Sequence, residues 1–171
     1  MLLGGLGLAG CETDPNAPYL WGIGDPVRGA ALRAPRNFGD PARWAGNPAN
    51  ATVAVEQQEF LASELATDPR YAPVVNPAVL QTLQRGRAEM REFLGIPATA
   101  DPQAVIEAMR RAGAALRAGN PAGAEAALTG PAFPAGPREV LARLGAMPRL
   151  PRTVAAAGMV AAEFDRLGQR G

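Results

Sequence analysis

The chain has 171 residues, with 17 basic and 16 acidic side chains and a formal net charge of +1. This length suits one domain, and the nearly neutral charge argues against a nucleic-acid partner. There is no His, a single Cys and a single Ser, and every basic residue is Arg. Catalytic triads, Lys Schiff bases and the usual zinc sites are therefore excluded, and we expect no cofactor, no metal and no enzymatic activity.

The first residues form an uninterrupted run of apolar and small residues that ends at the only cysteine, Cys11. This run is too short for a transmembrane helix. Its end, Leu8-Ala9-Gly10-Cys11, resembles the lipobox of bacterial lipoproteins, in which an apolar residue and two small residues precede the cysteine that receives the lipid. The resemblance covers residues 1–12, and the rest of the chain resembles no family that we recognise.

The lipobox resemblance implies that residues 1–10 are a signal-peptide-like segment, removed on export, and that Cys11 is lipidated. Signal peptides of that family begin with basic residues, whereas the first basic residue here is Arg28, so we expect a start upstream of Met1. Glu12 departs from the Asp that retains lipoproteins in the inner membrane, which favours the outer membrane. The alternative is a buried apolar segment with Cys11 as a free core thiol.

Residues 11–48 are rich in Pro and Gly but also contain Tyr19, Trp21, Phe38 and Trp44. This composition predicts an irregular leader. A solvated tether is normally poor in aromatic residues, so we expect part of the leader to pack on the helical body.

Residues 49–171 are predicted to form a single all-α domain. Asn or Asp followed by Pro precedes apolar-periodic runs, and Gly follows several of them, which are signals of helix starts and ends. The predicted helices lie near residues 50–66, 77–94, 102–118, 121–129, 137–144 and 152–167. Short connections between them predict a small bundle or array of antiparallel hairpins.

One basic residue, Arg87, projects into the apolar arc of its predicted helix, and Gln57 and Glu64 project into the arc of the preceding one. A buried charge needs a partner, so we predict that Arg87 bonds to Gln57 or Glu64. A tight antiparallel register favours Gln57. The alternative is a polar pocket in which Arg87 holds a ligand carboxylate.

Two Glu-x-x-Glu pairs remain as candidates for metal binding or acid–base chemistry: Glu56 with Glu59, and Glu89 with Glu92. Di-iron bundles take His as well as Glu, and this chain has none. Both pairs fall outside the apolar arcs, so solvated helix faces are the favoured interpretation.

These observations favour an exported helical protein that is anchored to a membrane by lipid, faces the periplasm and acts by contact with another envelope protein. A periplasmic small-ligand binder with a pocket around Arg87 is the first alternative. A carboxylate-dependent enzyme is the second, and it requires acidic residues that converge in a cleft.

Overall fold

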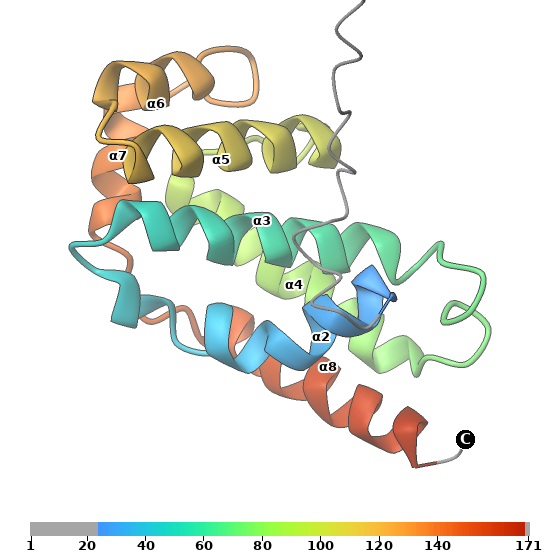
Figure 1. Cartoon of the computed structure of the whole chain (residues 1–171). Helices are drawn as coiled ribbons and strands as arrows, with labels where there is room; N and C mark the ends of the chain where they lie inside the picture. The colour runs from blue at the N-terminus through green and yellow to red at the C-terminus, as the bar shows by residue number, and fades with distance from the viewer. Residues whose placement is uncertain (1–23, 170–171) are drawn as a thin grey trace, which may run out of the picture.

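The computed structural model describes residues 24–169, which form seven α-helices, a short 3-10 helix and no strand (Figure 1). The all-α expectation is confirmed. The α-helices are α2 (Pro26–Asn37), α3 (Pro48–Glu64), α4 (Pro77–Leu94), α5 (Pro102–Arg117), α6 (Pro121–Ala127), α7 (Pro137–Gly145) and α8 (Pro151–Gly168), and the 3-10 helix is η1 (Pro41–Trp44). Helices α3 to α8 correspond to the six that the sequence predicts.

Each described α-helix begins with Pro, which has no backbone N–H to leave unpaired in the first turn. The side chain before that Pro accepts a hydrogen bond from a first-turn backbone N–H in α2 to α6, through Asp25, Asn47, Asn76, Asp101 and Asn120. The Asx-Pro signal thus fixes these helix starts through capping.

Helices α2, α3, α4 and α8 form a four-helix bundle in which α3 and α8 are diagonal to each other and both pack on α2 and α4 (Figure 1). Helix α5 lies along the opposite side of α3, and α6 and α7 extend that second layer. Helix α5 runs antiparallel to α3, because Arg110 contacts Glu56 while Arg117 contacts Ala49. The chain is therefore built around α3, which belongs to both layers.

Helix α3 and helix α5 approach closely where Gly113 faces Thr52. A Cβ atom at Gly113 would lie 2.4 Å from the Thr52 Oγ1 atom. Small residues in the contact let the two backbones come together, which suits a chain with few aromatic side chains.

The irregular leader predicted for residues 11–48 is wrong for its described part. Helix α2 and η1 occupy most of residues 24–48, and α2 packs on both α3 and α8. The expectation that this segment packs on the body is confirmed there, since Phe38 is fully buried and the Gly46 N–H donates to the Gly145 carbonyl at 2.7 Å. Tyr19, Trp21 and Cys11 lie outside the described residues.

Candidate functional site

The most unusual feature of the core is a run of consecutive polar residues in the middle of α3. Glu56, Gln57, Gln58 and Glu59, which we call the polar girdle, are all buried. Successive residues of a helix point about 100° apart, so the four side chains leave α3 in different directions. Because α3 is surrounded by helices, each of these directions meets a neighbour.

Glu59 forms the most deeply buried ion pair, with Arg91 of α4. The Arg91 Nε and Nη2 atoms donate to the two Glu59 oxygens at 2.6 and 2.7 Å, and the side chains are 4% and 2% exposed. The Arg91 Nη1 atom donates to the Pro97, Ala98 and Ala100 carbonyls at 3.0 to 3.2 Å. One guanidinium therefore joins α3, α4 and the loop before α5.

Glu56 binds Arg110 of α5, with 2.5 Å between the Arg110 Nε and the Glu56 Oε1. The two side chains are 21% and 10% exposed, so this pair lies nearer the surface than that of Glu59. It ties the second layer to the bundle at the point where α3 and α5 run side by side.

The two glutamines of the girdle bind backbone groups. The Gln57 Nε2 donates to the Ala30 carbonyl of α2 at 2.7 Å, and its Oε1 accepts from Asn37 at 2.6 Å. The Gln58 Nε2 donates to the Leu83 carbonyl of α4 at 2.9 Å, while its Oε1 has no hydrogen-bond partner among the described residues. The girdle thus reaches α2, α4 and α5.

The predicted partners of Arg87 are wrong. Arg87 donates to Ser63 at 3.3 Å and to Gln84 at 2.5 Å, and its Nη1 lies 4.0 Å from the Glu59 carboxylate. Burial, with the nearby Arg91 charge, lowers the pKa of Arg87, although Glu59 opposes this shift.

The two residues proposed for Arg87 lie elsewhere. Gln57 points to α2, and Glu64 is exposed at the end of α3. Gln58, not Gln57, is the glutamine that faces α4, because a difference of one residue turns the side chain by about 100°. The guanidinium that enters the interior is that of Arg91, which the apolar-arc argument did not single out.

The interpretation of the Glu-x-x-Glu pairs as solvated faces is wrong for three of the four residues. Glu56 and Glu59 are buried, and Glu92 alone is exposed. Glu89 accepts hydrogen bonds from the Thr153 N–H and Oγ1 at 2.9 and 3.1 Å. The sequence signal for burial is the position of the girdle between two apolar runs, residues 53–55 and 60–62.

Helices α4 and α8 cap each other. Glu89 of α4 bonds the first turn of α8, whose N-cap, Leu150, has no side-chain acceptor. Glu163 of α8 accepts from the Asn76 N–H, at the start of α4, at 2.8 Å, and it also binds Arg166. Carboxylates near helix N-termini favour both starts and fix the antiparallel pairing.

A polar cluster joins the start of α2 to the loop between α3 and α4. Asp25 accepts from the Tyr71 hydroxyl and lies 3.0 Å from the Arg70 guanidinium. Burial, and then the bond to Asp25, raise the pKa of Tyr71 to about 12. The hydrogen bond from Arg70 lowers the pKa of Asp68. The Tyr71 ring also packs on Phe164 of α8, at 4.7 Å between centroids.

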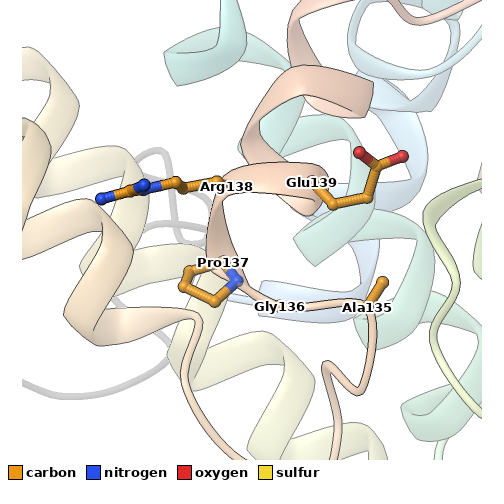
Figure 2. Close-up of a pocket in the computed structure, with 5 residues that line it drawn as sticks. All are labelled: Ala135, Gly136, Pro137, Arg138 and Glu139. Carbon is orange, nitrogen blue, oxygen red and sulfur yellow. The ribbon is translucent and has the colours of Figure 1, made fainter.

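Two surface depressions are found beside α5 and α7, and neither is lined by a residue of the girdle. One, of about 450 Å³, is lined by residues 135–139, and Figure 2 shows Arg138 and Glu139 pointing in different directions from the first turn of α7. The other, of about 260 Å³, is lined mainly by Pro and Ala, together with Thr99 and Asp101. Neither contains Arg87, and neither brings two carboxylates together.

Within residues 24–169, no group of His, Cys, Asp and Glu side chains has the arrangement of a metal site. No helix in that range is long and apolar enough to cross a bilayer. Comparison with protein-family models, curated proteins and solved structures gives no match to this chain. The site must therefore be interpreted from its own geometry.

Proposed function

We propose that the chain is an exported, lipid-anchored protein of the bacterial envelope that acts by contact with another protein rather than by catalysis. The observation that carries this proposal is the apolar run ending in Leu8-Ala9-Gly10-Cys11, which has the order of residues found in a lipobox. The chain has no second Cys with which Cys11 could form an internal disulfide.

The interior geometry supports a non-catalytic role for the acidic residues. Within residues 24–169 the buried carboxylates are Glu56, Glu59 and Glu163, and each is bonded to an arginine. A buried carboxylate held in this way is costly to leave without its arginine, so its pairing is part of the internal packing and it is not directed at a substrate. We therefore expect this domain to interact with other molecules through its outer surface.

Metabolic labelling with a palmitate analogue tests the proposal. The chain is expressed in a bacterial host with a basic segment ahead of Met1, beside a Cys11→Ala variant. We expect label and membrane association in the unmodified chain. The variant should carry no label and should be either released or left unprocessed. Equal labelling of the two proteins overturns the proposal, and a protein crosslinked only to the anchored form identifies the partner.

A further inference from the structure

The exposed face of α8 combines apolar and small residues with arginines. Its middle carries apolar or small residues at helical spacing, and Met159 is 37% exposed. Its beginning carries exposed arginines, with one from the adjacent α4. We call this surface the α8 face and define it by Arg85, Arg149, Arg152, Ala155, Met159 and Ala162.

The arginines lie at one end of the α8 face. Gly86 packs against the first turn of α8, because a Cβ atom there would lie 3.2 Å from the Arg152 carbonyl oxygen and 3.1 Å from the Ala156 Cβ. The backbone at Arg85 is therefore near that of Arg152, and Arg149 comes three residues before Arg152 in the sequence. None of the three forms an ion pair with a residue in the described range.

We propose that the α8 face binds the surface of an anionic lipid bilayer. Unpaired arginines attract anionic headgroups, and the exposed Met159 beside small residues can enter the interface. The two depressions described above lie on other parts of the surface.

The position of the chain outside the structure favours a bilayer over an acidic protein, and this step rests on the proposed function. The chain enters α2 at residue 24, and the Arg28 Nη2 would lie 3.0 Å from a Cβ atom at Gly168, so that entry is beside the last turn of α8. Residues 11–23 span at most about 45 Å when extended. A lipid on Cys11 would hold the whole domain, and with it the α8 face, within reach of the membrane.

Binding of the full chain to vesicles tests this inference, with Cys11→Ala in every sample so that no lipid is attached. Pure phosphatidylglycerol vesicles are compared with phosphatidylcholine vesicles by sedimentation. The apolar residues 1–10 contribute equally to both, so the difference between them reports charge. We expect tighter binding to phosphatidylglycerol that weakens as salt is added.

The decisive variants neutralise three arginines at a time. Arg85→Gln, Arg149→Gln and Arg152→Gln together should weaken binding to phosphatidylglycerol on the order of a hundredfold, at about fivefold for each arginine. The matched control neutralises Arg111, Arg117 and Arg138, which are exposed on α5 and α7 and carry the same total charge. It should retain most of the binding.

Equal weakening by both triple variants overturns the inference, because binding would then follow net charge alone. It is also overturned if the unmodified face shows no preference for phosphatidylglycerol, or if an acidic protein binds the face while vesicles do not. Circular dichroism and the thermal midpoint confirm that each variant is folded. The vesicle assay uses unacylated protein, so its failure is distinct from a failure of lipidation at Cys11.

Discussion

Helices α3 and α8 occupy diagonal positions of the same bundle, yet they use their residues in opposite ways. Helix α3 buries the polar girdle, whereas α8 exposes Ala155, Met159 and Ala162. Helix α3 has neighbours on every side because α5 covers its outer face, and nothing in the described chain covers the outer face of α8. Burial therefore follows the number of neighbouring helices more closely than it follows the polarity of the side chain.

The two helices also differ in how they specify packing. The girdle residues of α3 bind directional partners on α2, α4 and α5, so each contact is sensitive to rotation by one residue. Helix α8 is positioned at its ends, by Glu89 near its start and by Glu163 near its end. Substitutions in the middle of α3 should therefore be costly, whereas those in the middle of the α8 face should not.

The largest loss of stability is expected for Arg91→Met. This change keeps most of the aliphatic stem but leaves the Glu59 carboxylate buried without its partner, which should cost about 3 to 5 kcal/mol. Denaturant titration measures the loss. Arg111→Met is the matched control, because its ion pair with Glu107 is 63% and 52% exposed and should contribute less than about 0.5 kcal/mol. A similar loss of stability in both variants would show that the buried ion pair matters no more than the exposed one, which contradicts the expectation.

The two glutamines of the girdle should contribute different amounts to the stability of the fold. Gln57→Leu removes two hydrogen bonds and leaves Asn37 and the Ala30 carbonyl without that partner, at a cost of about 2 kcal/mol. Gln58→Leu removes one bond together with a buried oxygen that has no described partner, so it should cost less than about 1 kcal/mol. Thermal or denaturant unfolding measures both losses, and a larger loss for Gln58→Leu than for Gln57→Leu would contradict this assignment of hydrogen bonds.

Replacing a glycine with Ala should change the stability in opposite directions in the two regions, the contact between α3 and α5 and the exposed face of α8. Gly113→Ala places a Cβ atom against Thr52 and should destabilise the protein by about 1 to 2 kcal/mol. Gly158→Ala meets open space on α8 and should stabilise it by about 0.5 to 1 kcal/mol through helix propensity. Paired thermal melts measure both shifts, and destabilisation by Gly158→Ala would show that the outer face of α8 is covered.

The last expected effect concerns Tyr71 and the stability of the fold at alkaline pH. Its pKa is raised to about 12, so the folded protein retains the hydroxyl proton more tightly than the unfolded chain, whose pKa is near 10. The stability from this group is complete below pH 10 and is lost between about pH 10 and 12. Tyr71→Phe should cost about 1 kcal/mol at neutral pH and remove that part of the alkaline loss. Unfolding at several pH values in both proteins measures the difference.

Helix starts were the most predictable part of the fold because their cause is local. Asn47, Asn76, Asp101 and Asn120 each cap a helix within a few residues, so the sequence contains the whole interaction. The start of α2 carries the same signal at Asp25, but Pro35 inside this helix and the surrounding Pro and Gly residues suggested irregular structure. Tertiary packing on α3 and α8 outweighs that local disadvantage.

The girdle was less predictable because its partners are distant in the sequence. An apolar arc identifies one buried face, whereas α3 has no exposed face through its middle. The bond from Gln57 to Ala30 also depends on a helix that the sequence did not predict. The pairing of Glu59 with Arg91 depends on how α3 and α4 cross, and the sequence of either helix alone does not determine that crossing.

The central claim is that the polar girdle is a set of directed internal contacts, and double-mutant cycles in denaturant titration test it most directly. Glu59→Gln with Arg91→Met should show a coupling of several kcal/mol, because both groups share one buried pair. The crossed combination, Glu56→Gln with Arg91→Met, should be additive within about 0.5 kcal/mol. Additive behaviour of Glu59 with Arg91, or equal coupling in the crossed pair, would contradict the account.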